Sequence, residues 1–246
     1  NDAGYSTYAA STSSRQPMLY VGANDGMLHA FDATTGKESW AILPRQLMSK
    51  LYKLSDSAYA TNHEFYIDGS ITIMDVKIGS NWKTILVAGM GPGGKGYIAV
   101  DVTIPTSPVV LWEFCNSSVC NVTDSELGYT YGNPIITKRA FDDKWVVYLS
   151  AGYDNSTGKG LISELDVGTG TILRKLYTGT GTAASPAGLS KINTYYDDFK
   201  NNNKATAIYA GDWDGKVWKW TLETNTTAPQ LLGSANDANG NAQPIT

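Results

Sequence analysis

Short apolar segments alternate along the chain with turns rich in glycine and aspartate. The same order recurs four times: an apolar segment, a turn, a second segment, another turn and a third segment. Within 217–221, Trp218 and Trp220 face one side while the intervening residues face the other, which is the period of a β-strand. The chain is therefore predicted to be all-β and built from repeated units. These units lie near residues 17–43, 64–114, 131–178 and 185–222.

The spacing of the repeats predicts the architecture. The residues that end the second segments are 69, 65 and 55 positions apart, namely Asp32, Asp101, Asp166 and Thr221. A WD40 propeller blade repeats every ~40–45 residues, so these units would carry insertions. We expect a β-propeller domain, or a fragment of one, over residues 1–246. Residues 223–246 are expected to begin a further blade of a larger propeller.

One segment departs from the strand pattern. After Pro44, which suits the first turn of a helix, apolar residues recur at helical spacing at Leu47, Met48, Leu51 and Leu54. This predicts one short helix near 44–54. The polar ends, 1–16 and 225–241, are expected to be loops or cut edges.

Charge and length restrict the function. The chain has 19 basic and 23 acidic residues, a net charge of −4, which argues against binding to nucleic acid or to an anionic membrane. Its 42% apolar residues occur in short runs such as 109–112 and 145–149, so no transmembrane segment is expected. The chain starts at Asn1 without a leader and is read as a mature product or an excised piece.

The two cysteines predict a disulfide rather than a metal site. Cys115 and Cys120 are five positions apart, and a structural zinc site needs four ligands. His29 and His63 are far from them in sequence. A disulfide would indicate an oxidising compartment such as a periplasm or a cell surface.

Motifs for catalysis and nucleotide binding are weak. Residues 89–96 match most of the sequence pattern of a phosphate-binding loop. However, Gly96 occupies the position where a Ser or Thr hydroxyl would bind magnesium, and the segment that follows is strand-like rather than helical. We interpret 89–96 as a glycine-rich hairpin. No serine lies in a nucleophile elbow, and His63 is interpreted as structural. We therefore expect no enzymatic activity and no organic cofactor.

The segment 197–206 has the spacing of a calcium loop. Asp198, Asn202, the carbonyl of Lys204 and the hydroxyl of Thr206 follow each other at the even spacing that calcium ligands often have. Lys200 falls in the same series, where its cation would oppose the ion. Calcium is therefore a doubtful ligand of a degenerate loop.

Residues 30–40 resemble the tryptophan-docking repeat of quinoprotein propellers, in which a tryptophan packs between blades. The resemblance implies quinoprotein-like blades and leaves open a fragment of a quinoprotein-like dehydrogenase. That family often carries a disulfide between adjacent cysteines beside the cofactor, whereas Cys115 and Cys120 are not adjacent. A periplasmic propeller scaffold is the other alternative.

An ordered set of blocks resembles the C-terminal propeller of the PilY/PilC family of type IV pilus biogenesis factors and tip-associated adhesins. The opening block, Met18 to Asp32, reads MLYVGANDGMLHAFD. Further blocks lie at 63–69, 82–101, 127–134, 145–153 and 209–219. The ordered set is much more specific than any single block.

This resemblance implies a non-enzymatic propeller of a larger secreted protein, exported through the periplasm to the pilus tip or outer membrane. It implies a role in pilus assembly, in opposing retraction and in attachment. Partners would be minor pilins or the tip complex, together with an unknown receptor on a host or abiotic surface. Many members carry a calcium loop of the form D-x-[DN]-x-D-x-x-x-D. That loop maps onto 198–206, where Asp198 is kept, Asn202 is an amide, and Lys200 and Thr206 depart from the pattern.

Overall fold

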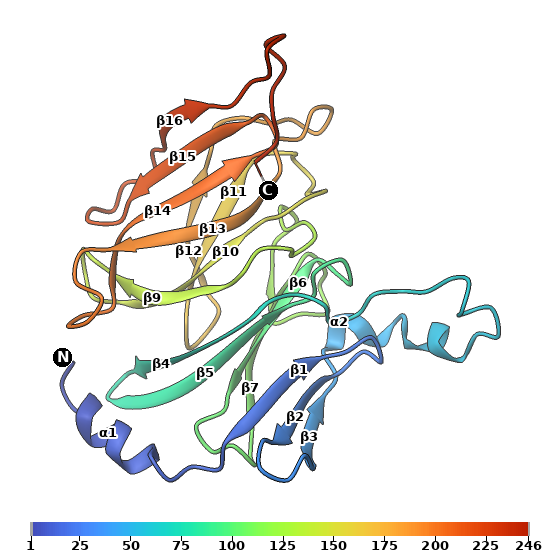
Figure 1. Ribbon diagram of the computed structural model, residues 1–246, viewed down its shortest axis with the longest axis vertical. Coiled ribbons are helices and arrows are strands. Elements are labelled where there is room, and N and C mark those ends of the chain that lie inside the picture. The colour runs from blue at the N-terminus through green and yellow to red at the C-terminus, as the bar shows by residue number, and fades with distance from the viewer. Residues whose placement is uncertain (1, 246) are drawn as a thin grey trace.

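In the computed structural model, residues 2–245 are described and fold into β-sheets stacked in the order of the sequence (Figure 1). Unit 1 is an antiparallel sheet in the order β1-β2-β3. Its strands are β1 (Met18–Gly22), β2 (Leu28–Asp32) and β3 (Glu38–Ile42). In Figure 1 these strands are drawn in blue at the lower end of the stack.

Unit 2 is the next sheet and has the order β4-β5-β6-β7-β8. Its long strands are antiparallel, and the short β8 is parallel to β7. The strands are β4 (Ile71–Ile78), β5 (Asn81–Gly89), β6 (Gly96–Asp101), β7 (Val109–Cys115) and β8 (Val122–Thr123). Every residue of β6 is buried, as expected for a strand covered on both faces.

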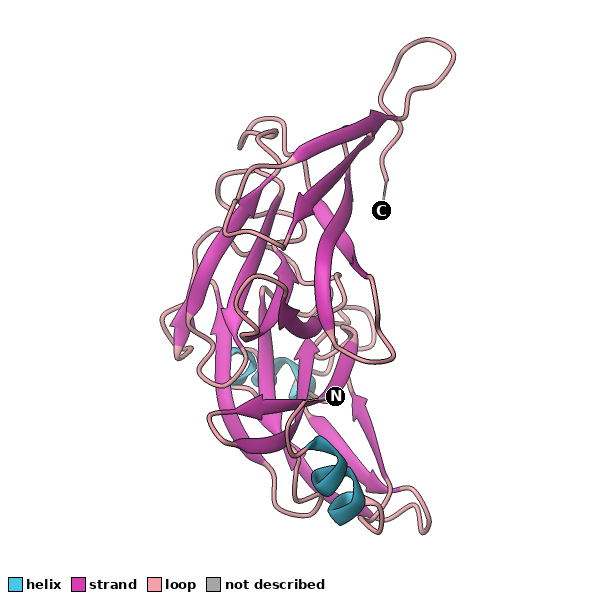
Figure 2. Cartoon of the chain, turned by 90° about the vertical axis from the view of Figure 1, so that its left-hand side faces the viewer, coloured by secondary structure: helices cyan, strands magenta, loops and turns pink. Residues whose placement is uncertain are grey.

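Units 3 and 4 share one eight-stranded sheet because β9 and the start of β14 pair in parallel. Unit 3 comprises β9 (Ile135–Arg139), β10 (Trp145–Ser150), β11 (Leu161–Asp166) and β12 (Ile172–Tyr177). Unit 4 comprises β13 (Leu189–Tyr196), β14 (Lys204–Asp212), β15 (Lys216–Thr221) and β16 (Gln230–Ser234). Figure 2 shows that strands dominate the described chain and that helices are small additions at its periphery.

Three apolar clusters join the units pairwise. Leu28 and Tyr66 pack with Leu86 between units 1 and 2, and Trp112 packs with Val147 between units 2 and 3. The third cluster lies within the shared sheet of units 3 and 4 and contains Trp220, which is fully buried. Stacking the sheets removes these apolar faces from water, which is the main favourable term in folding. The mostly-β propeller fold predicted from sequence is confirmed.

A buried ion network lies in unit 3. Glu164 is fully buried and accepts hydrogen bonds from Arg139 Nη1 at 2.6 Å, Arg174 Nε at 2.9 Å and the Tyr148 hydroxyl at 2.7 Å. Arg174 also donates to the carbonyl of Thr226, in the connection between β15 and β16. The network therefore ties all four strands of unit 3 to unit 4.

Units 2 to 4 contain an inner strand that the repeat pattern did not show. The sequence predicted three strands per unit, but β4, β9 and β13 precede the predicted strands and pair with β5, β10 and β14. In β13 the burial pattern is irregular, and the strand carries two register shifts against β14. Such a pattern has no clear period, so the repeat in the sequence did not predict this strand.

Helical structure follows the prediction near 44–54 and departs from it at the N-terminal end. The segment contains α2 (Arg45–Met48) and the 3₁₀ helix η1 (Leu51–Ser55). The expectation of a loop over 1–16 was wrong, because α1 (Tyr5–Thr12) lies there. The Tyr5 and Trp82 rings lie 4.7 Å apart between centroids, and Trp82 Nε1 donates to the carbonyl of Ala3 at 3.2 Å. Contact with unit 2 thus supports a helix whose own sequence has little amphipathic pattern.

Residues 225–241 were expected to be a loop or a cut edge, and for 230–234 this was wrong, whereas the start of a further blade within 223–246 stays a prediction. Strand β16 pairs with β15 and is the outer strand of unit 4. Beyond it, the Ile245 N–H donates to the carbonyl of Asp212 at 2.9 Å, much as the Ile67 N–H donates to Ala23 ahead of β4. Residues 243–245 thus lie where the chain approaches an inner strand in unit 2. Thr246 is outside the described residues, and the domain boundaries stay a prediction.

Candidate functional site

The turns between β1 and β2, β5 and β6, β10 and β11, and β14 and β15 lie along one side of the stack, at the same end of the strands in each unit, and we call this side the hairpin end (Figure 1). Backbone hydrogen bonds connect these turns to the segments that lead into the inner strands. Asp68 N–H donates to Met90 at 3.3 Å, and Gly152 N–H donates to Leu189 at 2.9 Å. Loops placed on such a rigid scaffold are where partners commonly bind.

The glycine-rich segment 89–96 is the hairpin between β5 and β6, as predicted. Thr130 from the next connection fixes it. The Thr130 hydroxyl accepts hydrogen bonds from the N–H groups of Met90 at 2.9 Å and Gly91 at 3.2 Å and donates to the Gly96 carbonyl at 3.0 Å. These backbone groups are hydrogen-bonded to Thr130 of the same chain, so the segment has a structural role.

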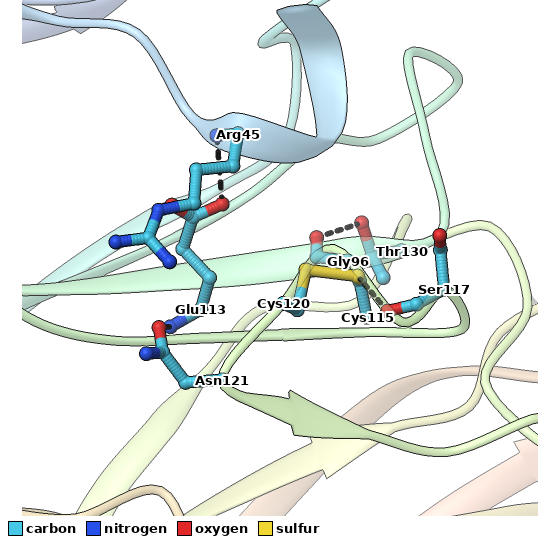
Figure 3. The surroundings of a disulfide bond; sticks show 8 residues. All are labelled: Arg45, Gly96, Glu113, Cys115, Ser117, Cys120, Asn121 and Thr130. Atoms are coloured by element: carbon cyan, nitrogen blue, oxygen red, sulfur yellow. Dashed lines mark hydrogen bonds between the residues drawn. A yellow bond between two sulfur atoms is a disulfide. The ribbon is translucent and has the colours of Figure 1, made fainter. Parts of the chain in front are cut away.

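Cys115 and Cys120 form the predicted disulfide, with an S–S distance of 2.04 Å (Figure 3). The bridge closes the loop that follows β7. Next to it, Asn121 Oδ1 accepts a hydrogen bond from the Glu113 N–H at 3.3 Å, and the Glu113 carboxylate accepts one from the Arg45 N–H at 2.9 Å. The closed loop and the start of α2 are therefore held to the same strand.

Three aromatic rings from three connections meet at the hairpin end, and we call them the aromatic platform. The ring centroids of Tyr153 and Trp213 lie 4.5 Å apart at an angle of 21°, and those of Tyr131 and Tyr153 lie 5.6 Å apart. Trp213 is 40% exposed and Tyr131 is 43% exposed. Trp213 lies in the turn between β14 and β15 and presents part of its ring to solvent.

Backbone contacts hold the platform in position. The Trp213 N–H donates to the Ala187 carbonyl at 2.6 Å, and the Tyr129 N–H donates to the Tyr153 carbonyl at 2.7 Å. Gly188 has φ +53°, and a Cβ there would lie 2.8 Å from the Tyr153 ring. Glycine at 188 therefore permits both the left-handed backbone and the close approach of the ring.

A charged pair borders the platform next to Tyr153. Lys95 Nζ lies 2.8 Å from Asp154 Oδ2 and 5.1 Å from the centre of the Tyr129 ring. The Asp154 side chain is 73% exposed. Asp154 has φ +59°, an uncommon conformation for a residue with a side chain. The border thus offers an exposed carboxylate and an ammonium group in a fixed arrangement.

His29 in β2 lies between two carboxylates. Its Nδ1 is 2.7 Å from Glu38 Oε1, and its Nε2 is 2.9 Å from Asp25 Oδ2. Partial burial lowers the pKa of the imidazole, but the hydrogen bonds and charges of Glu38 and Asp25 outweigh it and raise the pKa above its ordinary value. Both ring nitrogens can donate hydrogen bonds only when the ring is protonated, so the strength of this contact within unit 1 depends on pH.

The residues of the predicted calcium loop lie at the opposite end, where β13 connects to β14. The Asp198 carboxylate accepts hydrogen bonds from the side-chain amide of Asn201 at 2.8 and 2.9 Å. Asn202 Oδ1 accepts from the Lys204 N–H at 3.0 Å. The Lys204 ammonium is 2.6 Å from Asp143, and the Thr206 hydroxyl donates to the Tyr195 carbonyl at 3.4 Å.

This donor set does not fit a calcium ion. Calcium needs six to eight oxygen ligands, several of them carboxylates, and Asp198 is the one carboxylate in the series. The Asn202 and Lys204 interactions are those of a turn leading into a strand. Across residues 2–245, no three histidine, cysteine, aspartate or glutamate side chains are arranged to hold a metal ion.

Comparison with known families identifies the fold. The model of the PilY1 beta-propeller domain matches residues 1–245. The chain belongs to the PilY1 beta-propeller family. This confirms the family resemblance of the ordered blocks, and the match gives no support to the alternative of a quinoprotein-like dehydrogenase.

The PilY1 relatives include proteins described as type IV pilus biogenesis factors. The chain is 38% identical over 219 residues to PilY1 of Pseudomonas aeruginosa PAO1, which covers 89% of this chain and 18% of the relative. It is 36% identical over 244 residues to a PilY1 homolog of Xylella fastidiosa, covering 98% of this chain and 19% of the relative. The chain thus spans about a fifth of the length of these relatives.

A solved PilY1 structure has the same fold. The crystal structure of the Pseudomonas aeruginosa PilY1 C-terminal domain superposes with a TM-score of 0.79 at 33% identity, covering 98% of this chain and 50% of that one. The chain corresponds to half of that domain.

In residues 2–245 no helix is long and apolar enough to cross a membrane.

The sequence by itself did not bring the residues of the aromatic platform together. Tyr131 and Tyr153 lie in glycine-containing segments that read as ordinary turns. Their meeting with Trp213 depends on how connections from different units dock at the hairpin end. The recurrence of an aromatic residue beside each of these turns was the signal available.

Proposed function

We propose that this chain is a non-enzymatic propeller module of a type IV pilus biogenesis factor. It supports pilus assembly, opposes retraction and contributes to surface attachment. The carrying observation is the PilY1 family match over residues 1–245. The rigid stack with aromatic connections at the hairpin end suits a module that presents loops to partners.

We further propose that the module acts at the pilus tip or the outer membrane after export through the periplasm. Its partners there would be minor pilins or the tip complex. The Cys115–Cys120 disulfide supports an oxidising location. A surface receptor would be met by exposed side chains of the connections rather than by the fully buried strands such as β6.

Immunogold electron microscopy with an antibody against this chain tests the location. Label at pilus tips or on the outer surface supports the proposal. Label confined to the periplasm, with unlabelled pili, contradicts it and favours a periplasmic scaffold. A strain that lacks the gene is the control for antibody specificity.

Deletion of the segment from the source protein tests the roles in assembly and retraction separately. We expect few surface pili on the deletion strain. If pili return when retraction is also disabled, the module opposes retraction; if they stay absent, it acts in assembly. Normal numbers of pili in the single deletion would contradict both roles.

Calcium control belongs to the same proposal, and we infer that this chain does not depend on it. We expect calcium at millimolar concentration to leave the thermal midpoint unchanged, because Lys200 and Lys204 place two cations in the loop. A saturable shift that Asp198→Asn removes would contradict this. Magnesium at equal concentration controls for ionic strength.

A further inference from the structure

We propose that the aromatic platform of Tyr131, Tyr153 and Trp213 binds a neutral pyranose sugar, with Lys95 and Asp154 bonding its hydroxyl groups. The proposal deepens the attachment role and rests on it. It assigns a ligand class to a surface of the hairpin end. Its starting point is the meeting of three rings from separate connections.

The exposure of the platform sets it apart from the other aromatic residues. Trp112 and Trp220 are fully buried and fill the space between strands, whereas Trp213 is 40% exposed and Tyr131 is 43% exposed. Large rings left in water forgo the free energy of burial. Backbone hydrogen bonds from the Trp213 N–H to Ala187 and from the Tyr129 N–H to Tyr153 nevertheless hold the connections in place. The rings are therefore ordered before a ligand arrives, which reduces the entropy cost of binding.

The geometry of the rings selects the shape of the ligand. Tyr153 and Trp213 are nearly parallel at 4.5 Å, so their facing sides are in contact. An aromatic cage for a quaternary ammonium group needs open space between its rings, and this pair leaves none. What the platform offers is outward ring surface. A flat ligand with one apolar C–H face, such as a pyranose ring, matches that surface.

The charged border selects the polarity of the ligand. The Asp154 carboxylate accepts hydrogen bonds, and the Lys95 ammonium donates them. Sugar hydroxyls do both, so a ring lying on the platform could bond both groups along its edge. Because the two charges neutralise each other, the border favours a neutral sugar over an anionic one. The exposed aliphatic side chains of Leu19 and Leu232 lie in β1 and β16, away from the platform.

Saturation-transfer NMR on the 246-residue protein tests the proposal with three probes: methyl β-D-galactopyranoside, cellotriose and chitotriose. We expect at least one to bind with a Kd of about 1 mM, typical of a small exposed site. Trp213→Ala and Tyr131→Ala should each weaken that binding about tenfold or more, because stacking on an aromatic ring contributes strongly. Trp213→Phe should retain more binding than Trp213→Ala.

Tyr52→Ala is the matched control, because Tyr52 is 70% exposed but lies in η1, away from the platform. Its sugar binding should equal that of the wild type. If no saturation is transferred from the protein to any of the three probes at ~10 mM, a concentration that detects weak complexes, the proposal is overturned. An equal loss in Tyr52→Ala would overturn it as well.

A third readout separates this proposal from the pilus function. Wild type, Trp213→Ala and Tyr52→Ala are compared for binding to purified pili. If Trp213→Ala weakens pilus binding and leaves sugar binding unchanged, the platform is a protein-docking surface and the sugar proposal is wrong. If sugar binding fails while deletion of the segment still abolishes pili, the pilus function stands without it.

Discussion

Units 2 and 3 are covered on both faces, whereas units 1 and 4 each leave one face to solvent. All residues of β6 and β10 are buried, but β1 alternates between partly buried and exposed positions and β16 is exposed throughout. The strands of units 1 and 4 are not much less apolar: β1 reads MLYVG and β16 reads QLLGS. Burial in this fold is therefore decided by neighbouring sheets more than by strand composition.

The polar groups of the two regions differ in the same way. In unit 3, Glu164 is fully buried with two arginines, and the strands around it hold the network in place. In unit 1, His29 interacts with Asp25 and Glu38, whose side chains are 46% exposed. A buried network has a large effect when one member is removed, whereas an exposed one is screened by water.

The buried network gives the largest expected effect. Glu164→Gln should destabilise the protein by about 3–5 kcal/mol, because it leaves the buried Arg174 without a countercharge and Arg139 with Asp142 as its remaining carboxylate partner. Urea unfolding followed by tryptophan fluorescence measures the change. Asp214→Asn is the control: its pair with Lys216 at 3.4 Å is partly exposed, and the expected loss is about 0–1 kcal/mol. Similar losses in the two variants would contradict the contrast.

Truncation of leucine side chains sharpens the comparison of covered and uncovered sheets. Leu149 is fully buried between units, and Leu149→Ala should cost about 3 kcal/mol through lost burial and a cavity. Leu232 in β16 is 48% exposed, and Leu232→Ala should change stability by less than about 0.5 kcal/mol. Equal losses would show that the face of unit 4 is covered in solution, and sedimentation would then reveal a second copy.

The disulfide has an intermediate effect within unit 2. Replacing Cys115 and Cys120 by alanine together should lower the free energy of unfolding by about 2 kcal/mol, the value for constraining so short a loop in the unfolded chain. Urea titrations of the wild type and the double variant measure it. Adding dithiothreitol should lower the free energy of unfolding of the wild type to that of the variant and leave the variant's value unchanged. Equal stability of the two oxidised proteins would show that the bridge is dispensable.

The smallest expected effect is the pH dependence of stability that comes from His29 in unit 1. The folded-state pKa of His29 is raised above its ordinary value of 6.5. Its contribution is therefore full below pH 6.5 and is lost as pH rises through the folded-state pKa. Because the pair is partly exposed, we expect under about 1 kcal/mol between pH 6 and pH 9.

Glu38→Gln isolates this pH effect. It should remove most of the difference between pH 6 and pH 9 and lower the titration midpoint of His29 seen by NMR. His63→Gln is the control, since His63 contacts the rings of Tyr59 and Phe65. A His29 midpoint at or below 6.5 in the wild type would be inconsistent with the geometry.

Much of the strand pattern could be predicted from local sequence. The glycine-rich turn at 89–96 and the short helix after Pro44 depend on neighbouring residues, and each lies where it was expected. Strands β4, β9 and β13 were missed because their side chains meet partners from several connections and show no regular period. Helix α1 was missed because contact with Trp82, 77 positions after Tyr5, supports it.

The candidate sites divide along the same line. The Cys115–Cys120 pairing was predictable because five positions separate the two residues, and a chain that short keeps the sulfurs near each other. The calcium loop was a local pattern too, and Lys200 within it already argued against binding. For Tyr131 and Tyr153 the local signal was an aromatic residue beside a turn, and it did not show which rings are exposed or that the two meet.

The sequence by itself determined the repeated strands, the tight turns, the disulfide and the family, since each depends on residues close together or on an ordered set of blocks. The tertiary structure decided which strands are covered, where Glu164 finds its two arginines and which rings form the platform. Tyr131, Tyr153 and Trp213 are brought together by the docking of three connections from units 3 and 4. Such contacts are set by the stacking of whole sheets, and no local pattern encodes them.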